Sequence, residues 1–323
     1  MSAKSLAEKL LAGNRRALGR AITLVESTRT DAGLQKDQLL QTIMPRTGQS
    51  VRLGISGSPG VGKSTFIESV GSKLIEQGYK LAILAIDPSS PKTKGSILGD
   101  KTRMQDLAAD QRCFIRPSPA GRSLGGVARR TRESILLCEA AGYNFIIVET
   151  VGVGQSEVAV AGMVDQFIYL QLPNSGDDLQ GIKKGIIELA DSILINKADS
   201  DHLNAAKRSK VDLELALNLL YKNNTVEKPK VQLVSAKEKT GIDTFLDEVF
   251  EKITALKDKG DFSHRRSQQA IEWFKSEVSE LVLETVSAKK AFRENYLTLE
   301  KEVESMTLSP TTAAKQFIGT IGI

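Results

Sequence analysis

The amino-acid sequence predicts an α/β fold with a mostly parallel sheet flanked by helices. Short apolar runs, which suit strands buried on both faces, alternate with segments whose apolar residues recur at helical spacing. A glycine-rich loop, GSPGVGKST, follows the first apolar run and precedes a helical pattern. Such alternation places helices over a parallel sheet. Helical patterns without strands extend the chain on both sides of this region.

The sequence divides into three expected regions. Residues 1–48 form an N-terminal helical extension, because apolar residues such as Leu6 and Ile22 recur at helical spacing before the turn-like MPRTGQ. Residues 49–256 form the α/β domain. Residues 257–323 form a helical C-terminal arm, because this segment is charge-rich and has no strand-like run. The strands expected in the middle region are 51–55, 80–86, 145–148, 166–172, 192–195 and 231–234.

An apolar stripe runs along the expected C-terminal arm. Its members recur at four-three-four-three spacing and therefore share one helical face. They are Phe292, Tyr296, Leu299, Val303 and Met306. Such a face packs either on its own domain or on a second copy of the chain, and the spacing leaves both alternatives open.

The composition is that of an ordinary soluble globular protein. Of 323 residues, 41% are hydrophobic, and 44 basic against 39 acidic side chains give a net charge of +5. This modest excess suits phosphate ligands, but it falls short of the basic surface of a nucleic-acid-binding protein. We therefore expect no nucleic-acid partner.

The cysteines and the hydropathy indicate a reducing, cytoplasmic setting. Cys113 and Cys138 are too far apart for a CxxC pair, so neither a disulfide framework nor a zinc ribbon is indicated. The N-terminal residues are charged throughout, and no stretch is long enough to cross a bilayer. We therefore expect no membrane partner.

The loop from Gly57 to Thr65 has the GxxxxGKS spacing of a phosphate-binding P-loop. Its glycines let the backbone curve around phosphate oxygens, so that N–H groups and a helix N-terminus face the anion. Lys63 is placed to reach the β- and γ-phosphates, and Ser64 to bind Mg²⁺. The expected nucleotide-binding residues here are Gly57, Ser58, Gly60, Val61, Gly62, Lys63, Ser64 and Thr65.

The base is indicated by NKAD, which follows the expected strand 192–195. Asp199 can accept hydrogen bonds from the two N–H groups that guanine presents and adenine lacks, so adenine would leave a carboxylate unpaired. Asn196 is expected to brace the loop. SAK ends the next strand and is the usual companion of NKxD. The residues expected around guanine are Asn196, Lys197, Asp199, Ser235, Ala236 and Lys237.

A third motif, FIIVETVGVG over residues 145–154, is an apolar strand that ends in a carboxylate and continues into a switch. Glu149 stands where many G proteins have an aspartate that holds Mg²⁺. Asp87 and Asp100 are carboxylates that could join the metal shell, although Asp87 also fits a turn. Gln155 is the residue we assign to orienting the attacking water. The expected catalytic residues are Lys63, Glu149 and Gln155.

Seven sequence blocks occur in the order and spacing of one protein family, namely DPSSP, ILGDKTRM, IRPSP, LGGVARRTRE, ETVGVGQSE, LQGIKKGI and NKAD. The chain resembles the MeaB/ArgK G proteins over residues 6 to about 253. These are chaperone GTPases associated with methylmalonyl-CoA mutase and related adenosylcobalamin-dependent acyl-CoA mutases. The resemblance implies that Ser64, Asp87, Asp100 and Glu149 surround Mg²⁺ while Lys63 holds the phosphates.

The resemblance also implies a function. The chain would hydrolyse GTP to GDP and phosphate, slowly by itself and faster with its partner. It would gate the delivery of adenosylcobalamin to an acyl-CoA mutase of the methylmalonyl-CoA mutase type, and it would protect that enzyme. It implies switches at 100–104, 151–157 and 173–184, and a homodimer formed through C-terminal helices. The loop PNSGDD differs from the PGAGDE expected in the family, so details of the third switch do not carry over.

Three other interpretations stay open. A nickel-loading metallochaperone GTPase shares this fold, but His202 and His264 are the only histidines, and a nickel carrier usually has a His tract or closely spaced Cys and His. An ATPase or kinase linked to amino-acid transport, the family's former label, conflicts with NKAD. In the third, residues 263–323 are the functional module and the nucleotide domain is a scaffold.

Overall fold

The chain divides into two compact units, Met1–Arg266 and Ser267–Ile323. The domain borders expected at residues 48 and 256 stay predictions. No helix among the described residues has both the length and the apolar character needed to cross a bilayer. The computed structural model describes residues 2–27, 29, 32–87, 104–119, 124–150, 155–173, 184–222, 227–288 and 290–321.

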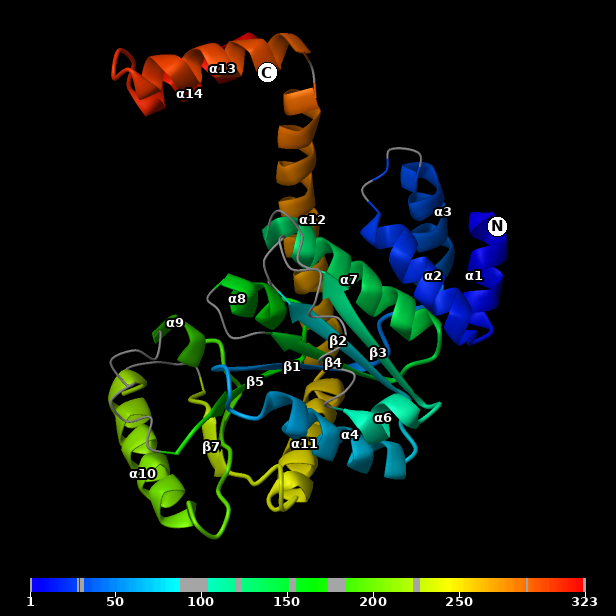
Figure 1. Cartoon of the computed structure of the whole chain (residues 1–323), viewed down its shortest axis with the longest axis vertical. Coiled ribbons are helices and arrows are strands. Elements are labelled where there is room, and N and C mark those ends of the chain that lie inside the picture. The colour runs from blue at the N-terminus through cyan, green and yellow to red at the C-terminus, as the bar shows by residue number, and fades with distance from the viewer. Residues whose placement is uncertain are drawn as a thin grey trace. The chain divides into compact units, whose positions relative to one another are not determined.

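In the described part of the first unit, parallel strands form one seven-stranded sheet in the order β3-β2-β4-β1-β5-β6-β7 (Figure 1). Helices cover both of its faces. The predicted α/β fold with a parallel sheet flanked by helices is confirmed. The strands are β1 (Val51–Gly57), β2 (Leu81–Asp87), β3 (Cys113–Pro119), β4 (Phe145–Thr150), β5 (Gln166–Gln171), β6 (Ser192–Ile195) and β7 (Lys230–Leu233).

Strand β3 is the one strand of this sheet that the sequence did not predict. Its sequence, CFIRPSP, contains Pro117 and Pro119, which lack the N–H donor that a central strand needs. β3 lies at the edge of the sheet, where it pairs with β2. A strand with one neighbour tolerates missing N–H donors on its free side. The two prolines therefore argue against a central strand but are compatible with this edge strand.

Alternate residues of the strands face two hydrophobic cores. On β2, Leu81 and Ile83 belong to one core, and Ala82 and Leu84 to the other. The first core is closed by α4 (Lys63–Glu76), α6 (Gln105–Ala109) and α11 (Ile242–Asp258), and the second by α7 (Leu124–Ala140), α8 (Gln155–Ala161), α9 (Lys184–Ile187), α10 (Leu203–Leu220) and the N-terminal helices.

The N-terminal extension is helical, as expected, and its apolar face is part of the second core. Ser2 and Asn14 cap the first two helices, because their side chains accept the N–H groups of Ser5 at 3.3 Å and Ala17 at 3.0 Å. The fully buried residues include Leu10, Leu18, Ile22, Leu39 and Ile43. The helices are α1 (Ala3–Leu11), α2 (Arg15–Glu26) and α3 (Gly33–Ile43), followed by the short η2 (Met44–Arg46).

The second unit contains most of α12 (Asp261–Ala288) together with α13 (Lys290–Glu304) and α14 (Pro310–Ile321). α13 and α14 pack on each other, and the rings of Tyr296 and Phe317 meet edge to face with centroids 5.4 Å apart. Ser309 caps α14 by accepting the N–H of Thr312 at 3.2 Å. Pro310 is the first residue of α14, a position that suits proline because the first turn of a helix needs no N–H donor there.

The predicted apolar stripe extends too far at Met306. Helix α13 ends at Glu304, and Met306 adopts a left-handed backbone with φ of +57°. Its N–H donates to the carbonyl of Val303 at 3.0 Å, closing the helix end. The Met306 side chain is 93% exposed, so it does not share the helical face of Tyr296.

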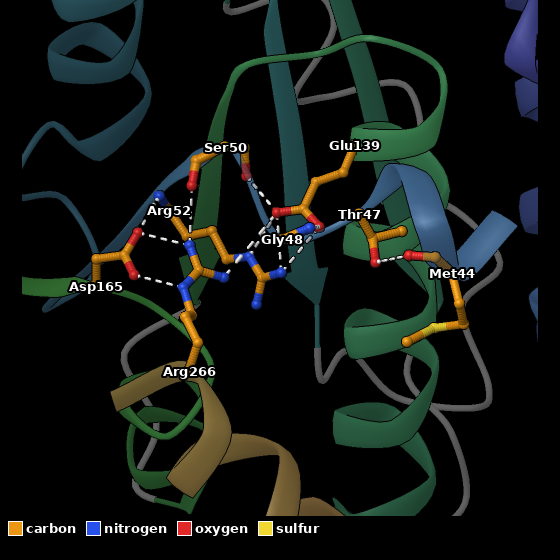
Figure 2. Close-up of polar contacts among 8 residues, drawn as sticks. All are labelled: Met44, Thr47, Gly48, Ser50, Arg52, Glu139, Asp165 and Arg266. Atoms are coloured by element: carbon orange, nitrogen blue, oxygen red, sulfur yellow. Dashed lines mark hydrogen bonds and ion pairs between the residues drawn. The ribbon is translucent and has the colours of Figure 1, made fainter. Parts of the chain in front are cut away.

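A buried ionic network joins the start of α12 to the amino edge of the sheet (Figure 2). Arg266 Nε lies 2.7 Å from Asp165 Oδ1, and its Nη2 donates to Asp165 Oδ2 at 2.8 Å. Arg52 on β1 donates through Nη2 to both carboxylate oxygens of Glu139, at 2.8 and 2.9 Å. None of the four side chains is more than 12% exposed. Burial lowers the pKa of Arg266, and the carboxylate of Asp165 opposes that shift.

Replacing Arg266 with methionine should lower the free energy of unfolding by about 3–5 kcal/mol, because Asp165 would stay buried without its cation. Urea unfolding measures the change. Arg265→Met is the matched control, since Arg265 is 38% exposed and lies 3.9 Å from Asp191. The control should lose no more than about 1 kcal/mol. Equal losses in the two variants would contradict the role assigned to Arg266.

Candidate nucleotide-binding site

The glycine-rich loop connects β1 to α4 at the carboxyl edge of the sheet. Gly57, Gly60 and Gly62 have φ of +153°, +82° and +94°, which side chains rarely adopt. A Cβ at Gly57 would lie 2.5 Å from the carbonyl oxygen of Leu170, and one at Gly62 would lie 2.8 Å from Asn196 Nδ2. The backbone therefore favours glycine at all three positions, as the P-loop spacing predicts, and at Gly57 a neighbouring backbone oxygen also excludes a side chain.

Lys63 is the first residue of α4, so its ammonium stands at the N-terminus of a 14-residue helix. Its Nζ donates to the carbonyl oxygens of Gly57 at 2.7 Å and Ser58 at 3.2 Å. Ser64 is half-buried and Thr65 is exposed. The cation and the helix dipole both favour an anion at this point.

Asn196 joins the P-loop to the SAK loop. Its Nδ2 donates to the carbonyl of Val61 at 2.8 Å, and its Oδ1 accepts the N–H of Ala236 at 3.1 Å. The side chain is buried. Ser69 of α4 also donates to the carbonyl of Ala236, at 2.7 Å. The predicted bracing by Asn196 is confirmed, and the brace reaches a second loop that the sequence did not link to it.

A cavity of about 290 Å³ lies between the P-loop and the NKAD loop. The Ser235 hydroxyl donates to Asp199 Oδ1 and accepts the N–H of Glu238 at 3.0 Å, which fixes the orientation of the carboxylate. The lining residues are Gly62, Thr65, Asn196, Lys197, Asp199, Ala236 and Lys237. All of them are expected nucleotide-binding residues, and they come from three separate segments.

Glu149 lies near the carboxyl end of β4, between β1 and β2. In register it stands beside Ile55 and Ala85, and it is 8% exposed. Asp87 is the last residue of the neighbouring strand β2. The strand order therefore brings Glu149 and the backbone of Asp87 to the edge at which the P-loop begins.

Three expected site side chains lie outside the described part of the structure, those of Asp87, Asp100 and Gln155. Asp100 lies outside the described residues, as do most positions of the three expected switches. Gln155 begins α8, so its backbone is placed but its side chain is outside the described part. Within that part, no three His, Cys, Asp or Glu side chains are grouped to hold a metal ion. The Mg²⁺ shell therefore stays a prediction.

A buried polar cluster next to the P-loop escaped the sequence reasoning. Ser56, Thr150 and Glu157 are fully buried there. A serine inside the apolar run VRLGISG and a glutamate at the head of the apolar EVAVA are the signals that could have revealed it. Neither signal predicts that Ser56, Thr150 and Glu157 lie together, because these residues come from three segments.

The two cysteines are buried, free thiols in different cores. Burial raises the pKa of Cys113 to about 12, and burial also raises that of Cys138. Both thiols therefore stay protonated at neutral pH, where a nucleophile or metal ligand would need the thiolate.

The chain matches, over residues 18–291, a protein family described as methylmalonyl Co-A mutase-associated GTPase MeaB. A probable GTPase of Mycobacterium tuberculosis is 48% identical over 313 residues, covering 97% of this chain and 93% of that protein. GTPase ArgK of Escherichia coli is 48% identical, with 95% and 93% covered. The Mus musculus protein named methylmalonic aciduria type A homolog, mitochondrial, is 44% identical, with 94% and 76% covered.

A solved structure resembles the chain over almost its full length. The crystal structure of a LAO/AO transport system kinase matches with a TM-score of 0.78 and 40% sequence identity. The match covers 99% of this chain and 98% of that one. The helical segments before and after the α/β domain are therefore part of a shared architecture.

Proposed function

This chain belongs to the family of methylmalonyl-CoA mutase-associated GTPases, MeaB, and from that membership we propose that it gates adenosylcobalamin delivery to an acyl-CoA mutase of the methylmalonyl-CoA mutase type and protects that enzyme. It is a GTPase, as its relatives are named. A cytoplasmic place of action is part of the proposal. The nickel-loading and transport-ATPase alternatives are not favoured by these relatives.

The cavity between the P-loop and the NKAD loop is the observation that supports guanine most directly. Asp199, oriented by Ser235, would accept the ring N–H and the exocyclic N–H of guanine. Asn196 holds the P-loop and the SAK loop at a fixed separation, so the phosphate and base sites are set together. The remaining base-site residues are Lys197, Ala236 and Lys237.

The triphosphate would lie over the P-loop, held by backbone N–H groups, the α4 N-terminus and Lys63. Ser64 and Glu149 offer hydroxyl and carboxylate oxygens, the donor types that Mg²⁺ prefers, so these residues fit the ion. Asp87 and Asp100 would complete the set. Bound Mg²⁺ would neutralise charge between the β- and γ-phosphates.

Hydrolysis would proceed by in-line attack of water on the γ-phosphate, with the protein supplying mainly position and charge. Gln155 would orient the water from the start of α8. No glutamine directly follows Gly152, where many G proteins keep that residue, so the intrinsic rate would be slow. A partner that rearranges the switches 100–104, 151–157 and 173–184 would raise it.

The C-terminal arm would make the chain a homodimer. On α12, Phe274 is 67% exposed, Val278 43% and Leu281 46%. These residues recur at helical spacing, and a second copy would cover the apolar face that they form. Light scattering should give twice the chain mass of 35.1 kDa. A mass of one chain would argue against the homodimer.

We expect an adenosylcobalamin-dependent acyl-CoA mutase to accelerate GTP hydrolysis by at least about tenfold, since partners that complete a GTPase site can contribute much more. Phosphate release is measured with and without the mutase, and the same mixture is tested for co-purification. Equal rates together with no co-purification would contradict the partner assignment. ATP in place of GTP is the specificity arm, and a preference for ATP would contradict the guanine site.

A further inference from the structure

Next to the P-loop, four polar side chains from three segments are buried together. Ser56 lies on β1, Thr150 is the last residue of β4, and Ser156 and Glu157 lie in the first turn of α8. Ser56, Thr150 and Glu157 are fully buried, and Ser156 is 6% exposed. We call these residues the Glu157 cluster. The proposed hydrolysis step gives them no role.

Glu157 accepts the hydroxyl groups of the cluster. Thr150 Oγ1 donates to Ser56 Oγ at 2.8 Å, and Ser56 Oγ donates to Glu157 Oε1 at 3.3 Å. Ser156 Oγ donates to the other carboxylate oxygen, Oε2, at 3.2 Å. Each oxygen of Glu157 thus takes one hydroxyl, and Thr150 reaches Glu157 through Ser56.

A carboxylate in this place costs stability. In the described part of the chain it accepts hydrogen bonds from hydroxyl groups, which offset only part of the cost of taking a charge out of water. An apolar side chain of similar volume would pack here at lower cost. Because Glu157 costs stability, we expect its role to lie in the segments that it joins.

Each of these segments carries a residue of the proposed site. Ser56 directly precedes the P-loop, Thr150 directly follows Glu149, and Glu157 lies two residues after Gln155. The Glu157 cluster therefore ties the P-loop strand, the strand of the metal-binding carboxylate and the start of α8 together at one point. Supporting contacts of this kind fix the groups that do chemistry.

We propose that Glu157 is a positioning residue for GTP hydrolysis. It holds the start of α8 against the ends of β1 and β4, so that Gln155 and Glu149 keep fixed places relative to the P-loop. The inference rests on the proposed roles of Glu149 and Gln155. A displacement of about 1 Å can cost about 100-fold in rate. Other residues bind the nucleotide, so loss of Glu157 affects kcat rather than KM.

Glu157→Leu fills the same space but accepts no hydrogen bond. We expect its kcat for GTP to fall by at least about tenfold, with KM changed by less than about twofold. Glu157→Gln keeps a carbonyl oxygen for Ser56 and should recover part of the loss. Both variants are compared after thermal melting has shown a cooperative transition, so that unfolded protein is not counted as inactive enzyme.

A second measurement reports on the position of α8 instead of the rate of GTP hydrolysis. Hydrogen exchange is measured on peptides that cover residues 145–150 and 155–161, with GDP and with a non-hydrolysable GTP analogue. In the unmodified chain the two nucleotides should give different protection. In Glu157→Leu the peptide 155–161 should exchange faster than in the unmodified chain. The increase in its exchange rate should be the same with GDP as with the GTP analogue.

Ser50→Ala is the matched control. It removes the hydroxyl that donates to Glu139 Oε1 at 2.5 Å, a similar contact at the opposite edge of the sheet, and should leave kcat and exchange unchanged. An unaltered kcat in folded Glu157→Leu, or an equal loss in Ser50→Ala, would overturn the inference.

The variant Glu149→Gln distinguishes a failure of the positioning role of Glu157 from a failure of the proposed function. Full hydrolysis by Glu149→Gln would refute the proposed site, whereas full hydrolysis by Glu157→Leu alone would refute only the positioning role.

Discussion

Lys63→Ala should abolish measurable GTP hydrolysis while leaving the protein folded. The Lys63 ammonium is held over the P-loop by the carbonyl oxygens of Gly57 and Ser58, at the N-terminus of α4. A fixed donor at that place opposes the charge that develops on the transferred phosphoryl group. Removing one such donor costs about 10²–10³-fold in kcat, and the full charge of lysine places the expected loss at or above the upper value.

Lys73→Ala tests whether the effect belongs to the site. Lys73 lies near the other end of the same helix, is 32% exposed and pairs with Asp243 at 3.1 Å. Its removal changes the charge of the chain equally but should leave the rate unchanged, because an exposed pair contributes little. Phosphate release and thermal melting are measured on both variants. Continued hydrolysis by folded Lys63→Ala would refute the assigned role.

The parts of the site that sequence predicted are those whose geometry is local. From Gly57 to Lys63, each glycine is needed for a backbone angle or a close approach within or beside one short loop, so spacing alone reveals the structure. The base motif behaves in the same way. Asp199 and Ser235 each lie in a loop that follows a predicted strand, and parallel strands bring their carboxyl ends to one edge.

What sequence did not predict depends on contacts between distant segments. The cluster of Ser56 and Glu157 joins positions 101 residues apart, and no periodicity records such a meeting. Strand β3 was hidden for another reason, since Pro117 and Pro119 oppose a central strand but not an edge strand. At Met306 the expected stripe continued a helical spacing past the point where the backbone turns left-handed.

The shared brace on Asn196 explains why the phosphate and base sites should act as one unit. Its amide joins Val61 to Ala236, so a movement of the P-loop is passed to the loop around the base. The missing Cβ of Gly62 leaves room for that amide, since a Cβ there would lie 2.8 Å from Asn196 Nδ2. Base recognition can therefore be tested by changing Asp199, which stands outside this brace.

Asp199→Asn should weaken GTP binding by at least about 100-fold and move the preference toward xanthosine triphosphate. Both guanine N–H groups would donate to Asp199, and hydrogen bonds to a charged group are worth about 1.5–3 kcal/mol each. Asparagine offers one acceptor and one donor, so its NH₂ would meet the amino group of guanine. Xanthine carries a carbonyl oxygen at that position, which can accept from the new donor. Ser235 can still donate to the amide oxygen, as it now does to the carboxylate.

Competition against a fluorescent GDP measures the affinities for GTP, xanthosine triphosphate and ATP. Asp201→Asn is the control, because Asp201 is an exposed carboxylate two residues further on that does not line the cavity. A distorted loop would weaken all three nucleotides alike. A gain in affinity for xanthosine triphosphate together with a loss of affinity for GTP requires direct contact between residue 199 and the base. Unchanged affinity for GTP would show that Asp199 does not bind the base.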